Sequence, residues 1–201
     1  MSFSLFHSGP HLGLGTHRIE TERLVLRRFR MTDAQDMFDT WSSDEETARF
    51  MRWTRHEDVS ETRATVSYWV RSYRFGGYEW AVTLKDGTLI GSIGIMDISE
   101  GERSGELGYC IARPYWNRGY GTEALGAVID YMFDRVGLNR LEAYHAVGNP
   151  ASGRIMEKCG MQKEGICREK YRTADGLADC AHYAILAKDV RPRRTNPRDK
   201  A

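Results

Sequence analysis

Residues 114–124 read Pro-Tyr-Trp-Asn-Arg-Gly-Tyr-Gly-Thr-Glu-Ala and connect a predicted strand to a predicted helix. A strand-like run, 106–111, precedes them. The run that follows is amphipathic, because apolar residues recur at helical spacing: Leu125, Val128, Ile129, Met132, Phe133 and Val136. Gly119 and Gly121 therefore fall in the first helical turn. Free backbone N–H groups and the helix dipole at such a turn favour an anion, such as a pyrophosphate.

Two well-known nucleotide-binding patterns do not match this stretch. A P-loop has Lys and then Ser or Thr after its second glycine, whereas Thr122 and Glu123 stand here. A dinucleotide fingerprint has a third glycine where this chain has Ala124. On this motif alone, an ordinary strand-to-helix turn remains the alternative.

A second strand-to-helix segment, 141–161, strengthens the interpretation as a ligand site. It contains Asn-Pro-Ala-Ser, followed by a predicted short helix over 150–159. Asn149 is a favoured N-cap residue, and Pro150 suits the first helical turn. Gly160 can take the left-handed conformation that ends a helix.

Taken together, these motifs resemble the GNAT superfamily of acyltransferases, and within it the RimJ/RimL-like branch of N-acetyltransferases. The matching motifs occur in the family's order within about residues 18–188, at 23–27, 90–91, 94, 105–109, 118–124, 149–152 and 157–161. Three positions depart from the family pattern. Trp116 replaces the usual Gln or Arg, Asn117 replaces a frequent Gly, and Met161 replaces a usual aromatic residue.

The predicted fold class is α+β, with a mixed central β-sheet of about seven strands and helices on both faces. Strands are expected at 24–28, 79–84, 89–96, 106–111, 140–146, 162–172 and 178–187, and helices at 33–43, 59–74, 120–136 and 150–159. Thr32 is expected to cap the first helix. The resemblance implies that the strands splay apart at the acyl-CoA site. We expect one domain over 18–188, a partly ordered arm over 1–17 and a basic flexible tail over 189–201.

Composition narrows the class of protein. A chain of 201 residues with 41% hydrophobic content suggests one domain with a real core. The formal charge of +1 implies no bulk attraction to nucleic acid, so no specific nucleic-acid partner is expected. No apolar run is long enough for a membrane span, and no secretory signal is visible. The four cysteines lack CxxC spacing and the six histidines lack metal-ligand spacing. We therefore expect a cytoplasmic protein with reduced thiols and no metal.

The resemblance implies that a neutral amine attacks acetyl-CoA directly in a ternary complex. It also implies a set of residues that bind acetyl-CoA: Tyr109, Cys110, Ile111, Asn117, Arg118, Gly119, Tyr120, Gly121, Thr122, Asn149 and Ser152. The backbone N–H of Ile111 or a neighbour would stabilise the carbonyl oxygen as it gains charge. Ser152 matches the serine that the branch places near the CoA sulfur, so it is a candidate to protonate the thiolate. Its alternative role is to satisfy a backbone group of the helix.

Three side chains are candidates to accept the ammonium proton: Glu106, Glu142 and His145. Glu142 and His145 are an odd number of residues apart on one strand, so they point to opposite faces of the sheet. His145 is alternatively a satisfied core residue, and a water chain could carry the proton instead.

The acceptor would be a peptidyl or small-molecule amine, bound by residues 30–75 and the last hairpin. A homodimer is a candidate assembly. An acyl-CoA-binding regulatory module without catalysis is the alternative function.

Overall fold

The computed structural model describes residues 12–192, which form one eight-stranded sheet in the order β1-β2-β3-β4-β5-β6-β8-β7. The strands are β1 (Ile19–Glu20), β2 (Leu24–Arg27), β3 (Tyr78–Leu84), β4 (Leu89–Ser99), β5 (Ser104–Ile111), β6 (Arg140–Ala146), β7 (Gln162–Thr173) and β8 (Gly176–Leu186). The mixed α+β architecture is confirmed. The strand that the sequence did not predict is β1, whose two residues are too short to show a period.

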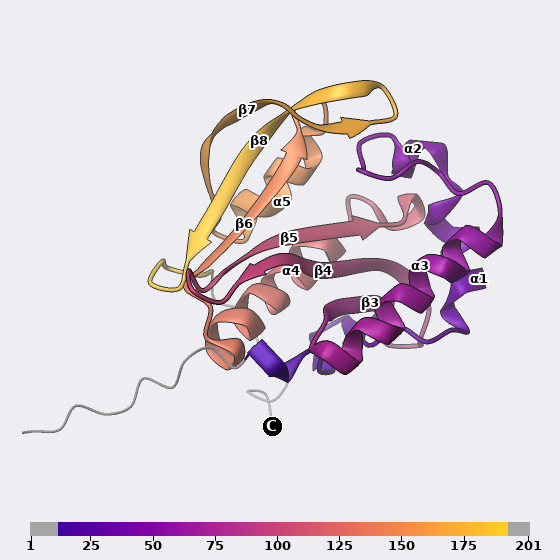
Figure 1. Ribbon diagram of the computed structural model, residues 1–201, viewed down its shortest axis with the longest axis horizontal. Helices are drawn as coiled ribbons and strands as arrows, with labels where there is room; N and C mark the ends of the chain where they lie inside the picture. The colour runs from indigo at the N-terminus through magenta and orange to yellow at the C-terminus, as the bar shows by residue number, and fades with distance from the viewer. Residues whose placement is uncertain (1–11, 193–201) are drawn as a thin grey trace, which may run out of the picture.

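Helices cover both faces of the sheet. The α-helices are α1 (Asp33–Met37), α2 (Glu45–Ala48), α3 (Val59–Ser72), α4 (Tyr120–Tyr131) and α5 (Pro150–Lys158). Shorter or wider helical turns are η1 (Leu12–Leu14), η2 (Phe38–Ser42), η3 (Tyr73–Phe75), η4 (Arg113–Tyr115) and η5 (Met132–Val136). Figure 1 shows α3 and α4 on opposite sides of the strands. No described helix is long and apolar enough to cross a membrane.

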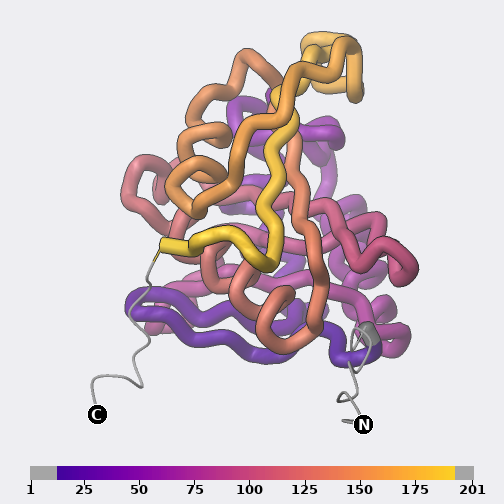
Figure 2. Tube along the Cα trace, turned by 90° about the vertical axis from the view of Figure 1, so that its left-hand side faces the viewer, coloured from indigo at the N-terminus to yellow at the C-terminus, as the bar shows by residue number. Residues whose placement is uncertain are grey.

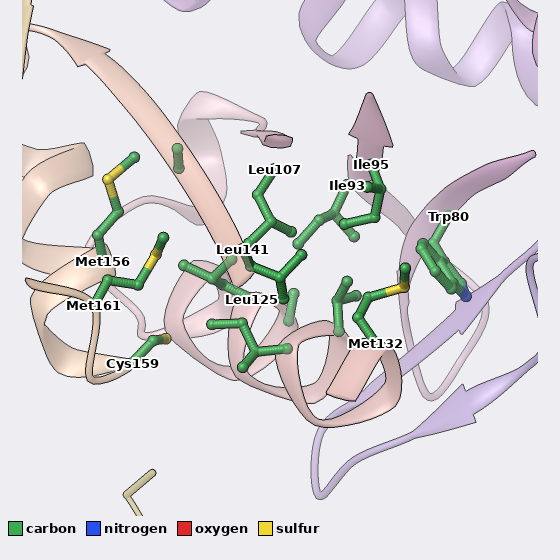
Figure 3. Packing of buried hydrophobic residues seen from close by; sticks show 14 of the residues in the cluster. Trp80, Ile93, Ile95, Leu107, Leu125, Met132, Leu141, Met156, Cys159 and Met161 are labelled. Atoms are coloured by element: carbon green, nitrogen blue, oxygen red, sulfur yellow. The ribbon is translucent and has the colours of Figure 1, made fainter. Parts of the chain in front are cut away.

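The main hydrophobic core lies between the sheet and α4. Leu125 of α4 and Met132 of η5 meet Leu141 of β6 and Trp80 of β3, and all four are fully buried (Figure 3). A second cluster packs α1 and α3 on the opposite face, around Trp41, Val66 and Ala81. The sheet is therefore packed between two layers of helices, one on each face.

Two predicted helix features take a different form. The run 120–136 begins as α4 but ends in the wider turn η5, closed by Gly137 at φ 84°. Thr32 was expected to cap α1, and this was wrong. Its backbone is itself helical and its side chain makes no capping hydrogen bond. Instead the Asp33 carboxylate accepts the Arg30 backbone N–H at 2.7 Å and pairs with Arg27.

β5 and β6 part from each other halfway along. Their parallel pairing runs only from Ser104 opposite Arg140 to Leu107 opposite Ala143. Beyond that point β5 stays paired with β4, and β6 stays paired with β8. Figure 1 shows β6 turning away from β5. The expected splay is confirmed, and it leaves the β6-facing backbone edge of residues 108–111 open.

Both ends of the described chain contact the domain. The Thr16 hydroxyl donates to the Gly77 carbonyl at 2.9 Å, and the Trp80 indole N–H donates to the His17 carbonyl at 2.7 Å. At the other end, Arg191 pairs with Asp134 at 2.7 Å. The expected arm and tail otherwise concern residues 1–11 and 193–201, which lie outside the described residues.

The hairpin of β7 and β8 reaches toward α2. Its turn stands out from the rest of the chain in Figure 2. The Arg49 guanidinium, at the end of α2, pairs with Asp175 in this turn at 3.1 Å. The hairpin and the helical region before α3 therefore meet across the open end of the splay.

We predict that Leu125→Ala lowers the free energy of unfolding by about 3 kcal/mol, because it leaves a cavity in the main core. Leu177→Ala is the matched control, since Leu177 lies in the hairpin and is 56% exposed whereas Leu125 is 0% exposed. The control should change stability by less than about 0.5 kcal/mol. Urea denaturation of both variants measures the difference, and equal losses would contradict this description of the core.

Candidate active site

A cavity of about 1210 Å³ opens where β5 and β6 part. One half is lined by β5, the loop before α4 and the start of α5. The other half is lined by α3, the segment before it and the neighbouring faces of β3 and β4. A ligand in the splay would therefore be reached from both faces of the sheet.

The loop before α4 presents a row of backbone donors. Asn117 and Gly119 take left-handed conformations, at φ 57° and φ 80°. Within the described residues, the backbone N–H groups of 118–122 donate to no acceptor, and no side chain caps the helix. These donors and the positive end of the helix dipole together form a site for an anion.

Arg23 holds this loop in place from a distant part of the sequence. Its Nε pairs with Glu123 Oε2 at 2.7 Å, and its Nη1 donates to the Arg118 carbonyl at 2.8 Å. The guanidinium also lies 4.6 Å from the centre of the Tyr120 ring. The loop is therefore ordered by contacts that do not require the ligand.

Gly121 allows α4 and α5 to approach closely. A Cβ at this position would lie 2.9 Å from Ile155 Cδ1, which is closer than real contacts allow. Gly121 therefore brings the first turn of α5 beside the anion site. That turn carries Asn149 and Ser152, both of which line the cavity.

Ser152 and Tyr109 form a hydroxyl pair across the splay. The two oxygens are 2.7 Å apart, and the Tyr109 hydroxyl can also donate to the Ser152 carbonyl at 3.0 Å. Burial raises the pKa of Tyr109, so its hydroxyl keeps its proton at neutral pH. Tyr109 was predicted among the residues that bind acetyl-CoA, and the sequence did not predict its side-chain contact with Ser152.

Three further residues near β5 and α5 have polar groups that are already engaged or not ionised. Asn149 caps α5 through its carbonyl, which accepts the Ser152 N–H at 3.2 Å, and not through its side chain. The Trp116 indole donates to the Ile111 carbonyl at 2.5 Å. Burial raises the pKa of the Cys110 thiol to about 12, so Cys110 is not a thiolate at neutral pH.

Glu106 is the predicted carboxylate that faces the other half of the cavity. It is 8% exposed and forms an ion pair with Arg52. Burial raises its pKa, and the charge of Arg52 partly opposes that rise. The Arg52 guanidinium also lies 4.7 Å from the centre of the Tyr171 ring. Arg52 thus links β5 to the last hairpin across the cavity.

Glu142 lies directly opposite Glu106 in the β5–β6 pair, and His145 lines the cavity on the side of α5, but both side chains are engaged elsewhere. Glu142 pairs with Arg140 and with His182, each at 3.2 Å, and does not line the cavity. His145 Nδ1 is 2.8 Å from the Ala146 carbonyl, and its ring packs against Gly153 of α5. The two side chains leave opposite faces of β6, as the spacing predicted.

A second carboxylate in the cavity, Glu79, was not predicted from the sequence. It projects from β3 over Gly94 of β4, where any Cβ would overlap it. Its side chain keeps some contact with the cavity, but the surrounding protein atoms remove most of its hydration. This raises its pKa from 4.5 to about 8. The alternation of strand 79–84 predicts that Glu79 and Trp80 point to opposite faces of the sheet. This alternation was the sequence signal from which the position of Glu79 could have been found.

The described residues contain no group of three His, Cys, Asp or Glu side chains that could hold a metal ion. What the cavity offers is a row of backbone donors, a hydroxyl pair and two carboxylates of raised pKa. These groups can bind an anion, donate a proton and accept one.

Comparison with known proteins places the site in context. Residues 23–162 match the family model described as an acetyltransferase (GNAT) domain. The uncharacterized N-acetyltransferase YoaA of Bacillus subtilis (strain 168) is 33% identical over 178 residues, covering 87% of this chain and 97% of that protein.

Two further similarities extend over most of the chain. The ribosomal protein uS5 alanine N-acetyltransferase of Escherichia coli (strain K12) is 28% identical over 189 residues, covering 88% of this chain and 94% of that protein. The solved structure of Mycobacterium smegmatis RimJ in complex with CoA-disulfide has a TM-score of 0.81 at 23% identity, covering 92% of this chain and 93% of that one. It shows the same fold.

We predict that Glu79→Gln stabilises the protein relative to the unsubstituted chain, by an amount that grows as the pH rises. The folded-state pKa of about 8 lies above the ordinary value of 4.5, so the folded protein holds one proton more than the unfolded chain between these values. Stability is therefore lost with rising pH, by at most about 1.4 kcal/mol per pH unit. Glu79→Gln removes this loss.

Thermal melting at pH 5.5 and pH 8 measures the effect. The advantage of Glu79→Gln over the unsubstituted protein should widen by several degrees between the two pH values. Glu102→Gln is the control, because Glu102 is exposed in the turn between β4 and β5. An advantage that stays constant with pH would show that Glu79 is ionised in the folded protein.

Proposed function

Because this chain belongs to the GNAT family of acetyltransferases, we propose that it transfers the acetyl group of acetyl-CoA to a primary amine by direct attack within a ternary complex. The family resemblance expected from the motifs is confirmed by the match over residues 23–162. The observation that carries the proposal is the splay of β5 and β6 beside a loop with unpartnered N–H groups. This arrangement suits a long ligand with an anionic end and an extended amide arm.

In this proposal the backbone donors of 118–122 bind the CoA pyrophosphate. The pantetheine arm, which carries amide groups, pairs with the open backbone edge of 108–111 as an added strand would. The thioester then lies in the splay beside Ser152. Mycobacterium smegmatis RimJ, which shares this fold, was solved in complex with CoA-disulfide, and this supports the same use of the fold here.

We assign the proton that reaches the thiolate to Ser152. When the amine nitrogen bonds to the carbonyl carbon and the C–S bond breaks, the sulfur gains negative charge. The Ser152 hydroxyl can donate a proton to it if Tyr109 donates to the Ser152 oxygen, which their 2.7 Å separation allows. Tyr109 thus positions Ser152 and stabilises the developing alkoxide.

We assign the proton that leaves the amine to Glu106, directly or through water. Its carboxylate faces the acceptor half of the cavity and its pKa is raised by burial, which brings it nearer to neutral pH. A base is most effective when its pKa lies near the working pH. Glu142 has no such access, because it is held by Arg140 and His182 outside the cavity.

The acceptor belongs to the side lined by α3 and the hairpin. The Escherichia coli relative is named for acetylating an alanine of a ribosomal protein, so a peptide N-terminus is one candidate acceptor and a small amine is the other.

The Ser152–Tyr109 pair and Glu106 favour catalysis over a purely regulatory CoA-binding module. We place the enzyme in the cytoplasm, in accord with its four free cysteines.

The test is release of free thiol from acetyl-CoA in the presence of a panel of amines. The panel should contain peptides with free N-termini and small mono- and diamines, with mass detection of the acetylated product. Thiol release that depends on an amine supports the proposal. Calorimetric binding of acetyl-CoA without transfer to any amine would instead support the regulatory module.

We predict that Gly119→Val weakens CoA binding at least tenfold. Gly119 has φ 80°, and a Cβ there would lie 3.3 Å from Arg23 Nη2. Valine therefore strains the loop and displaces the Arg23 side chain that holds it. Gly101→Val is the control, because a Cβ at Gly101 meets nothing within 4 Å. Calorimetry with CoA on both folded variants measures the effect. Unchanged CoA affinity in Gly119→Val would show that this loop does not bind the pyrophosphate.

We predict that Ser152→Ala lowers kcat about a hundredfold and leaves the KM for acetyl-CoA near its original value, because the thiolate charge exists chiefly in the transition state. Tyr109→Phe should give a smaller fall in kcat, since Ser152 keeps its hydroxyl. Steady-state kinetics, in an assay where chemistry limits the rate, make the comparison. Full turnover in Ser152→Ala would reduce Ser152 to a structural residue of α5.

A further inference from the structure

The acceptor half of the cavity holds two carboxylates, Glu106 and Glu79, in different electrostatic states. Glu106 has a cationic partner, Arg52. Glu79 has none among the described residues, and loss of hydration alone accounts for its raised pKa. Its backbone groups are bonded, to Thr16 and Tyr73, but its carboxylate is not.

The strand register aims Glu79 toward the splay. Glu79 lies opposite Gly94 of β4, and Gly94 lies opposite Gly108 of β5. Gly94 adds no side chain to this row, and over Gly108 lies the flexible Met96 side chain, whose Cε would be 2.8 Å from a Cβ there. An acceptor would displace this methionine, which is 41% exposed, to reach the edge of β5. The Glu79 carboxylate already lies over Gly94. Because neighbouring strands are about 4.8 Å apart, the carboxylate over β4 is roughly 10 Å, or two strand spacings, from the splay beyond β5 where the acetyl group would lie.

The walls around this path suit a positively charged group. Tyr68, Trp69 and Phe75 line the cavity from α3 and η3, and Trp53 lines it from the segment before α3. Aromatic faces attract cations, whereas they offer nothing to a second anion. The segment before α3 contributes Arg52 and His56 to the cavity. The charge of Arg52 is already engaged by Glu106, and burial lowers the pKa of His56, which favours its neutral form.

We propose, resting on the acetyl transfer proposed above, that Glu79 binds a second cationic group of the acceptor, an ammonium three to five carbon atoms from the nitrogen that is acetylated. The acceptor class is therefore a compact dicationic amine. The ammonium supplies the partner that the carboxylate lacks, in a place where neighbouring protein atoms already remove part of its hydration. A hydrogen bond between two such charged groups contributes roughly 10- to 150-fold in affinity.

The stability of the chain adds a physical argument. A glutamine fits the same space over Gly94 without the cost of burying an ionisable group, so the carboxylate is a liability for folding. Such groups are typical of functional sites. A cation beside Glu79 would lower its pKa again and stabilise the ionised form.

The competing role for Glu79 is general base for the attacking amine. The two roles separate in the kinetics, since loss of a binding group for a remote ammonium raises KM, whereas loss of the base lowers kcat. They also separate by substrate, because a base serves every amine and a cation subsite serves only dications.

The experiment compares 1,4-diaminobutane with 1-aminopentane, in which a methyl group replaces the second ammonium. The unsubstituted enzyme should prefer the diamine at least tenfold in kcat/KM. Glu79→Gln should raise the KM for the diamine at least tenfold, keep its kcat, and leave the monoamine unaffected. Glu102→Gln, exposed in the β4–β5 turn, should behave as the unsubstituted enzyme. A thermal melt confirms that each variant is folded.

Three results would overturn the inference. The unsubstituted enzyme could show no preference for the diamine, or could acetylate other amines of the panel and neither probe. Alternatively, Glu79→Gln could lower kcat equally for both amines, which would make Glu79 the base.

Failure of the proposed function is separable from these results, because no amine at all would then be acetylated. Calorimetry of 1,4-diaminobutane in the presence of CoA covers that case. Binding that is lost in Glu79→Gln supports the cation subsite, and equal or absent binding in both proteins overturns it.

Discussion

The end of parallel pairing between β5 and β6 is the constraint on which the site depends. A parallel pair normally continues until one strand ends, yet here both strands continue, each paired only with its outer neighbour, β4 for β5 and β8 for β6. Backbone groups that a closed sheet would satisfy are left facing a cavity instead. The flanking elements then act as walls of this gap, and each face of the sheet contributes its own chemistry to one opening.

The two sides of the gap carry opposite electrostatic character. On the side of α4 and α5, the groups are donors: backbone N–H groups held by Arg23, and the hydroxyls of Tyr109 and Ser152. On the side of α3, they are acceptors: Glu106, balanced by Arg52, and Glu79, balanced by nothing in the described chain. An anionic cosubstrate and a cationic acceptor would thus enter from faces that already favour each of them, and the difference itself orients the two ligands.

Local sequence signals predicted most of the fold, but they did not predict several of the side-chain contacts in the cavity. The end of α5 near Gly160 and the left-handed Gly119 at the start of α4 follow from backbone rules that act within a few residues, so they could be anticipated. Thr32 failed as a cap because Arg27 and Asp33 satisfy that turn by a contact the cap rule ignores. The Tyr109–Ser152 pair and the position of Glu79 over Gly94 depend on strand register, which one sequence does not specify.

Arg23 joins residues that are about a hundred positions apart in the chain, since its bond to Glu123 spans 100 residues. Contacts of this span are slow to form because a long loop must close first. The anion loop can therefore reach its final shape only after the first long strand has docked beside α4. During synthesis β2 emerges well before α4. The contact between Arg23 and Glu123 therefore cannot form until more than half of the chain has left the ribosome. Because β6, β7 and β8 follow Glu123 in the chain, this contact reports the docking of β2 beside α4 and not completion of the sheet.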